Sequence, residues 1–251
     1  GIAMLDFGSS YRLGVPVFDL IMDRLPATLL LTGTAFVLSL VLGIVAGSMA
    51  AARVKKPSGS LIMALALVFY ATPLFWVALM SVVVFSVYLG WLPAYGLYTV
   101  GAGHTGFALV LDVAKHLVLP ATTLALFFMA IYTRMTRTSM LDAAQQDYVK
   151  TARAKGLKPG TIQRRHVLRN ALLPIITLAG LQAGQMVGGA ILTETVFAWP
   201  GIGRLMFEAL QQRDYNLLLG IFFFSAALVI VFNIITDVVY RLADPRIKGA
   251  S

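Results

Sequence analysis

Five long stretches of hydrophobic residues, each with few charges, run along this chain of 251 residues. A helix needs about 20 apolar residues to cross a bilayer, and the stretches are of that order or longer. The predicted spans lie at about residues 26–52, 60–89, 116–136, 171–193 and 215–240. The strands of a membrane β-barrel are shorter and alternate in polarity. The pattern therefore predicts an all-α, polytopic membrane protein with a single transmembrane domain over residues 1–251.

The composition supports a membrane protein independently of this pattern. Hydrophobic residues make up 59% of the chain and charged residues only 12%, with a mean hydropathy of +0.82. Soluble domains carry about 25% charged residues. A net charge of +9 is compatible with nucleic-acid binding, but basic cytoplasmic loops explain it better. The chain has no cysteine, which excludes disulfides and thiolate metal sites.

Basic residues are distributed unevenly between the two sides of the predicted membrane. Loops on one side carry 15 Lys and Arg residues and loops on the other carry 5, with nine of the 15 between Arg134 and Arg169. Because cytoplasmic loops are enriched in Lys and Arg, we expect the loop 137–170 and the C-terminus to be cytoplasmic and Gly1 to be outside. An outside N-terminus without a signal peptide is unusual, and one further helix upstream would account for it.

Sequence motifs for enzymatic chemistry are absent. There is no G-x-x-x-x-G-K-[ST] loop to bind nucleotide phosphates, and neither H-E-x-x-H nor G-x-S-x-G occurs. The three histidines have no metal-ligand spacing. We therefore expect no catalytic residues, no metal site and no ATP hydrolysis by this chain alone.

Small residues recur at helical spacing in two of the spans, and such ridges let helix backbones approach closely. They are Ser39, Gly43 and Gly47 in the first ridge, and Gly180, Gly184 and Gly188 in the second. Packing within the bundle is the simpler interpretation; a seam against a partner or a translocation pathway is the alternative. Gln182 and Gln185 share a helix with the second ridge, and for them a structural hydrogen bond and substrate contact remain equally open.

Two local interruptions have a predicted shape. Pro73 should kink the second span, because proline removes a backbone hydrogen bond. After Glu194, the outer loop 194–214 contains a W-P-G turn and then a short amphipathic helix, Gly203 to Gln212. This helix is too short to span, and its apolar face should comprise Leu205, Met206, Ala209 and Leu210.

The segment "DYVKTARAKGLKPGTIQRRHVLRNALLP" is strongly basic although it lies between two apolar spans. Asp142 to Lys155 favours a helix with Tyr148, Val149 and Ala152 on one side, and Gly156 is placed to end it. The residues K-P-G-T then turn the chain, and a second short helix from Thr161 leads into span four. The charge alone is equally consistent with contact with anionic lipid and with docking of a soluble partner. The helix–glycine–helix shape favours the soluble partner.

This segment resembles the cytoplasmic loop of ABC-importer permeases, in the form used by the B-type permeases of the dipeptide/oligopeptide (and nickel) branch. Lys150, Thr151 and Ala152 occupy the positions of the family's E-A-A motif, and Gly156 that of its glycine, although the glutamate itself is missing. The stretches "LDFGSSYRLGVPVFDLIMDRLPATL", "TETVFAWPGIGRLMFEALQQRDY" and "ADPRIK" are similar to that branch as well. Members of the family carry one more N-terminal span than this chain.

The resemblance implies the type I importer permease fold, with five helices present and a sixth, N-terminal one missing, in a bacterial inner membrane. It implies import of di- or oligopeptides together with a second homologous permease, two cytoplasmic ATPase domains and an external peptide-binding protein. ATP and Mg would bind the ATPase subunits, with no cofactor in this chain. The alternative is an ion-coupled secondary transporter or channel, which usually carries ionisable residues within its spans.

The resemblance also assigns roles to particular residues. The contact with the ATPase falls on Asp147, Tyr148, Thr151, Ala152, Arg153, Ala154, Gly156 and Leu157. Position in the chain alone assigns Gln182, Gln185, Gly188 and Glu194 to the translocation pathway. The sequence does not distinguish dipeptides, longer peptides, glutathione and chelated nickel as the substrate.

Overall fold

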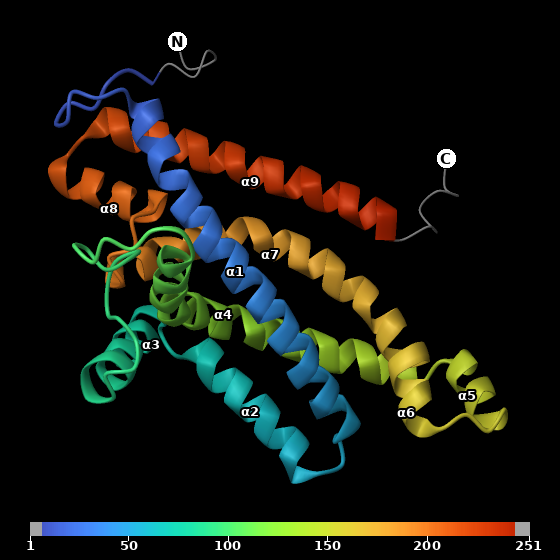
Figure 1. The fold of residues 1–251 in the computed structure, drawn as a ribbon. Helices are drawn as coiled ribbons and strands as arrows, with labels where there is room; N and C mark the ends of the chain where they lie inside the picture. The colour runs from blue at the N-terminus through green and yellow to red at the C-terminus, as the bar shows by residue number, and fades with distance from the viewer. Residues whose placement is uncertain (1–6, 244–251) are drawn as a thin grey trace, which may run out of the picture. The chain divides into compact units, whose positions relative to one another are not determined.

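The structure, a computed structural model, describes residues 7–243, apart from the side chains of residues 187, 189, 236, 237 and 239–243. Helices account for most of the described chain (Figure 1). They are α1 (Val17–Ala52), α2 (Pro57–Ala71), α3 (Leu74–Ser81), η2 (Val82–Tyr88), α4 (Gly106–Ala144), α5 (Asp147–Ala154), α6 (Pro159–Thr161), η3 (Ile162–Leu168), α7 (Arg169–Val196), α8 (Ile202–Gln212) and α9 (Tyr215–Ala243). Among the described residues, β pairing is limited to an isolated bridge between Ser9 and Pro16. The predicted all-α class is confirmed.

Four helical stretches are long and apolar enough to cross a membrane, and they cover four of the five hydrophobic segments. The segment 60–89 is different, because α2 ends at Ala71 and α3 begins at Leu74, giving a broken span or a re-entrant segment. Pro73 is the cause: it has no N–H to donate, and it disfavours helical geometry in the residue before it. The break is thus larger than the predicted kink. The C-terminus, predicted to be cytoplasmic, lies outside the described residues.

Contacts divide the chain into two compact units. Unit 1 comprises Gly1–Phe36, Thr72–Ala125 and Gly184–Val231, and unit 2 comprises Val37–Ala71, Leu126–Ala183 and Phe232–Ser251. Helices α1, α4, α7 and α9 each contribute residues to both units. The residues predicted to contact an ATPase all lie in unit 2, whereas the predicted pathway residues other than Gln182 lie in unit 1.

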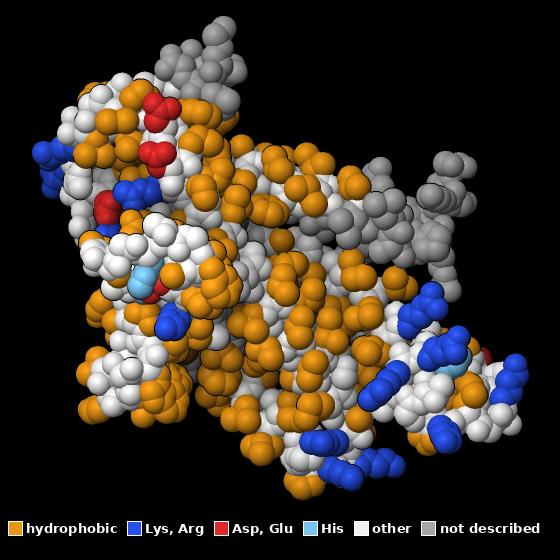
Figure 2. All heavy atoms as spheres, in the orientation of Figure 1, with side chains coloured by type: hydrophobic (Ala, Val, Ile, Leu, Met, Phe, Trp, Pro, Cys, Tyr) orange, Lys and Arg blue, Asp and Glu red, His pale blue; other side chains and the backbone are white. Residues whose placement is uncertain are grey.

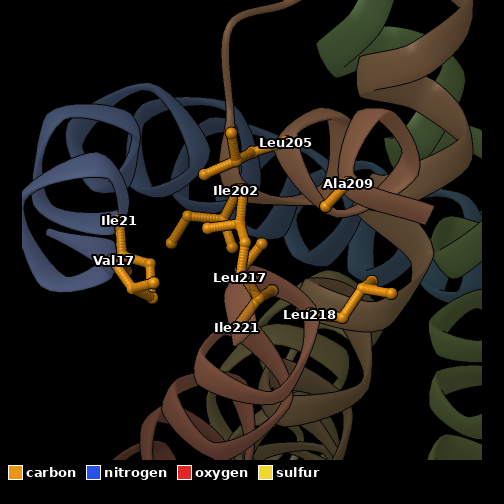
Figure 3. Close-up of a cluster of buried hydrophobic side chains, with 8 residues drawn as sticks. All are labelled: Val17, Ile21, Ile202, Leu205, Ala209, Leu217, Leu218 and Ile221. Atoms are coloured by element: carbon orange, nitrogen blue, oxygen red, sulfur yellow. The ribbon is translucent and has the colours of Figure 1, made fainter. Parts of the chain in front are cut away.

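The core of unit 1 joins the start of α1 to α8 and to the start of α9. The buried side chains of this cluster, drawn in Figure 3, are Val17 and Ile21 from α1, Ile202, Leu205 and Ala209 from α8, and Leu217, Leu218 and Ile221 from α9. The predicted helix 203–212 corresponds closely to α8. Its apolar face is narrower than expected, because Leu210 is 62% exposed.

In unit 2, α1 and α4 approach closely at two of the glycines predicted to serve packing. A Cβ atom on Gly43 would overlap the Cβ atom of Tyr132, and one on Gly47 would lie 2.6 Å from the carbonyl oxygen of Thr133. Both contacts are shorter than real Cβ atoms allow. Ser39, the third residue of this ridge, is fully buried. The small side chains therefore allow the backbones of α1 and α4 to approach at this place.

Candidate functional site

The basic segment folds into a helical hairpin, named here the basic hairpin (residues 147–168) and made of α5, α6 and η3. α5 ends in a Schellman motif: Leu157 N–H donates to the Ala152 carbonyl (3.3 Å) and Gly156 N–H to the Arg153 carbonyl (2.9 Å). Gly156 has φ +76°, a conformation that costs other L-residues about 1–2 kcal/mol. The glycine thus fixes where the hairpin turns.

The hairpin is held to the rest of unit 2 by a small apolar cluster. Val149 and Ala152 of α5 pack with Ile162 and Val167 of η3, and with Ala51, Met140, Ala143 and Ala171 of the long helices. Next to this cluster lies a cavity of about 310 Å³, whose lining includes Arg153, Leu157 and Pro159. Only two side chains of α5 are buried, so its other residues remain free for an external contact.

Most residues predicted to touch an ATPase lie on the exposed side of the hairpin. Asp147, Thr151, Arg153, Ala154, Gly156 and Leu157 are exposed, whereas Ala152 is 5% exposed and faces the cluster. Tyr148 is 38% exposed, so it does not share the buried side of Val149 and Ala152 as the helical pattern predicted. The first helix is also shorter than predicted: α4 continues to Ala144, and α5 begins only at Asp147.

Positive charge covers this hairpin. Its six basic residues are all exposed, and Asp147 is the only acidic residue among positions 147–168. Figure 2 shows these Lys and Arg side chains gathered over the hairpin, in contrast to the hydrophobic side chains that cover the long helices. Asp147 accepts a hydrogen bond from Lys150 Nζ at 2.8 Å, but this pair is exposed and contributes little to stability. The surface therefore suits an acidic partner.

In unit 1, Glu194 lies in the last turn of α7, with its carboxylate against the first turn of α8, and it is fully buried. Its Oε1 accepts a hydrogen bond from Thr28 Oγ1 (2.7 Å), and its Oε2 accepts one from the backbone N–H of Arg204 (3.0 Å). The same Thr28 hydroxyl oxygen accepts the N–H of Ile202 at 2.8 Å. The carboxylate and the hydroxyl together satisfy backbone donors in the first turn of α8, which Gly201 cannot do because it has no side chain.

Two glycines make room for this carboxylate. A Cβ atom on Gly201 would overlap the carboxyl group of Glu194, and one on Gly203 would lie 2.6 Å from the Cα atom of Ile191. Trp199, also fully buried, adds a second tie to α1 by donating from Nε1 to the carbonyl of Ala27 at 2.8 Å. The segment "TETVFAWPGIG" therefore connects α1, α7 and α8 through buried hydrogen bonds and close packing at its glycines.

The four residues assigned to a pathway do not form one group. Gln185 and Gly188 are exposed and line a cavity of about 340 Å³ in unit 1, together with Gly184, Thr28, Ile202, Gly203 and Met206 among others. Glu194 is enclosed by its hydrogen-bond partners and does not line this cavity. Gln182 is buried in unit 2, as is Gly180.

Sequence reasoning missed Thr28 and Trp199. Both residues lay inside stretches quoted for their family resemblance, but nothing in those stretches indicated their partners. Thr28 is 166 positions from Glu194, and a single threonine in an apolar span has no local pattern that marks it. Only the fold brings the three side chains together.

The sequence matches the family described as "Binding-protein-dependent transport system inner membrane component" over residues 43–249. The chain belongs to this family. Its curated relatives include the dipeptide transport system permease protein DppB of Alkalihalophilus pseudofirmus, 40% identical over 98% of this chain and 78% of the relative. The oligopeptide transport system permease protein AppB of Bacillus subtilis is 43% identical over 97% of this chain and 76% of the relative.

Solved structures show the same fold at lower identity. The permease resembles a chain of the MetNI methionine ABC transporter in an inward-facing form, with a TM-score of 0.72 and 17% identity over 90% of this chain and 97% of that one. A chain of an amino acid ABC transporter gives a TM-score of 0.66. The predicted importer permease fold is thereby confirmed, and an ion-coupled secondary transporter is not favoured.

Membership in the family sets the general role of this chain. It is a polytopic membrane permease of an ABC importer and not itself an enzyme. Such an importer includes ATPase subunits and a substrate-binding protein, so ATP hydrolysis belongs to the partners.

Proposed function

We propose that this permease imports dipeptides or oligopeptides across the bacterial inner membrane. The observation that carries the proposal is the identity of 40–43% along nearly the whole chain to permeases named for dipeptide and oligopeptide transport. A second homologous permease completes the pathway, and a peptide-binding protein delivers the substrate from outside. ATP and Mg bind the two ATPase domains, and this chain carries no cofactor.

The basic hairpin is the proposed contact with an ATPase subunit. Its exposed Tyr148, Arg153 and Leu157 offer one aromatic, one cationic and one aliphatic side chain on a short helix whose end is fixed by the Schellman motif. Ala152 supports this surface from below rather than touching the partner. The positive charge of the loop 137–170 supports a cytoplasmic location for the hairpin, and the C-terminus is proposed to lie on the same side.

The cavity lined by Gln185 and Gly188 is the proposed part of the pathway within this chain. It combines mostly apolar walls with the side chain of Gln185, a lining suited to a peptide, which has both apolar side chains and backbone polar groups. Gln182 and Glu194 are proposed to support the pathway from buried positions.

Uptake by the complete transporter in liposomes tests the substrate. We expect ATP-dependent accumulation of a labelled dipeptide or oligopeptide when the paired binding protein is present, and no accumulation of free amino acids. Uptake of chelated nickel in place of peptide would overturn the substrate assignment while leaving the permease role intact.

A matched pair of tyrosine variants tests the contact with the ATPase. Tyr148→Ala removes an exposed ring from the hairpin, and Tyr95→Ala removes one that is 60% exposed in the loop before α4. Because truncating an aromatic residue at the centre of an interface costs more than about 1 kcal/mol, Tyr148→Ala should weaken ATPase co-purification and reduce peptide uptake per ATP hydrolysed. Ala152→Glu, which buries a charge under the hairpin, should uncouple more strongly. Equal ATPase recovery with Tyr148→Ala and Tyr95→Ala would overturn the proposal.

A further inference from the structure

The hydrogen bonds of Glu194 connect it to the cavity, although its side chain does not line the cavity. It binds the first turn of α8 directly through the N–H of Arg204 and indirectly through Thr28, which binds the N–H of Ile202. Ile202 and Gly203 of the same turn, and Met206 of the next, form one wall of the cavity that Gln185 and Gly188 also line. The carboxylate thus determines where this wall lies.

The backbone on both sides of α8 shows that the helix is held in a defined position. Ala198, just before it, has φ +48°, and Arg213, just after it, has φ +56°. Non-glycine residues adopt this conformation only when surrounding contacts require it. Arg204 stabilises the first of these, since its Nη1 donates to the Ala198 carbonyl at 2.6 Å.

We infer that Glu194, acting with Thr28, is a positioning residue for transport: it fixes the α8 wall of the cavity lined by Gln185 and Gly188. The inference rests on the proposed function, because it assumes that this cavity receives the peptide. The carboxylate is well suited to this role, since both of its oxygens accept hydrogen bonds: one from the Thr28 hydroxyl of α1 and one from the Arg204 N–H in the first turn of α8, where negative charge is favoured. An amide in its place keeps one accepting oxygen but turns its NH2 group toward one of these two donors.

The test uses substitutions in the complete transporter, reconstituted in liposomes with its second permease, ATPases and binding protein. The hydrogen bonds that Glu194 and Thr28 make to the first turn of α8 are named here the Glu194–Thr28 clamp. Glu194→Gln and Thr28→Val disrupt this clamp, whereas Thr28→Ser keeps the hydroxyl group at position 28. Thr193→Val is the matched control, because Thr193 is equally buried but its Oγ1 has no hydrogen-bond partner among the described residues. Initial uptake rates of a labelled peptide, normalised to folded transporter, give the half-saturation concentration and the maximal rate separately.

We expect Glu194→Gln and Thr28→Val to raise the half-saturation concentration about tenfold, the size of effect that follows the loss of one charged hydrogen bond. The maximal rate should change less than about twofold, and Thr28→Ser and Thr193→Val should match the wild type. A variant that only lowers the amount of folded transporter, with unchanged half-saturation, would show a purely structural role and overturn the inference.

Amide hydrogen exchange in α8 separates this inference from the proposed function. The N–H groups of residues 202–204 should exchange at least tenfold faster in Glu194→Gln than in Thr193→Val, whatever the substrate. If the wild-type transporter takes up no peptide, the proposed function fails. Amide exchange then still tests by itself whether Glu194 holds the first turn of α8 in place. Unchanged exchange at these three amides overturns it.

Discussion

The basic hairpin and helix α8 are both short helical elements inserted between long apolar helices, yet different interactions hold them. α5 of the hairpin buries only Val149 and Ala152, and all six Lys and Arg side chains of the hairpin are exposed. α8 buries Ile202, Gly203, Leu205 and Ala209, and a buried carboxylate lies near each end: Glu194 before it and Asp214 after it. The hairpin, which we propose binds a soluble partner, keeps its polar groups outside, whereas the ends of α8, which we propose shapes a cavity, are held by buried carboxylates.

The largest effect should come from disturbing the packing at the start of α8. Gly203→Ala places a Cβ atom 2.6 Å from the Cα atom of Ile191, a backbone atom that cannot move aside cheaply. Overpacking of this kind costs about 3 kcal/mol, so we expect a clear fall in the Tm of the detergent-solubilised permease.

The control for this variant is Gly33→Ala in α1, where a Cβ atom meets nothing within 4 Å. There alanine should be neutral or stabilise the helix by about 0.5–1 kcal/mol. Equal Tm values for the two variants would mean that α8 tolerates displacement, and its contrast with the hairpin would then disappear.

Asp214 should show the next largest effect. Its carboxylate accepts hydrogen bonds from Ser10 Oγ and from the N–H groups of Arg12 (3.3 Å) and Leu217 (3.2 Å). Asp214→Asn replaces one of the two accepting oxygens by an NH2 group that faces a donor, and should cost about 2 kcal/mol, measured as a lower Tm at neutral pH. The exposed Asp142→Asn serves as the control and should leave Tm unchanged.

The contribution of Asp214 should also depend on pH. Burial alone would raise the pKa of this carboxyl, but the hydrogen bonds from Ser10 and from the backbone amides outweigh burial and lower the pKa below its ordinary value of 3.8. A lowered pKa stabilises the fold above that value, and the contribution is lost as the pH falls through the folded pKa. The difference in Tm between wild type and Asp214→Asn should therefore narrow below about pH 4, and a constant difference would contradict this account.

Particular residues show how far the sequence predicts this molecule. Long apolar runs predicted the helices because spanning a bilayer requires them, and Pro73 marked the break because its chemistry acts locally. The start of α5 was missed because the break at residues 145–146 contains no glycine or proline. Leu210 was placed on the wrong face because helical periodicity does not reveal which neighbours a face will meet. The clamp of Thr28 on Glu194 depends on tertiary contact, which no local pattern encodes.

A smaller effect is expected at the turn of the basic hairpin. Gly156→Ala forces alanine to adopt φ +76°, although a Cβ atom meets nothing within 4 Å, so the cost is conformational and amounts to about 1–2 kcal/mol. Since α5 is held by few contacts, we expect faster amide exchange at residues 152–157 without a change in Tm. Gly160→Ala, which has equal space and no positive φ, is the control; faster exchange in that variant as well would show that the whole hairpin is loosely held.

The smallest effect should come from the corresponding position after α8. α8 ends in the same Schellman motif, with N–H bonds from Asp214 to Ala209 (2.9 Å) and from Arg213 to Leu210 (3.2 Å), but its left-handed residue is Arg213, with φ +56°. Arg213→Gly relieves this strain, while the greater freedom of glycine in the unfolded chain offsets part of the gain. We therefore expect stabilisation of about 0.5–1 kcal/mol, seen as a small rise in Tm. A fall in Tm would mean that the Arg213 side chain stabilises α8 itself, and that the two helix ends differ in more than the residue at their turn.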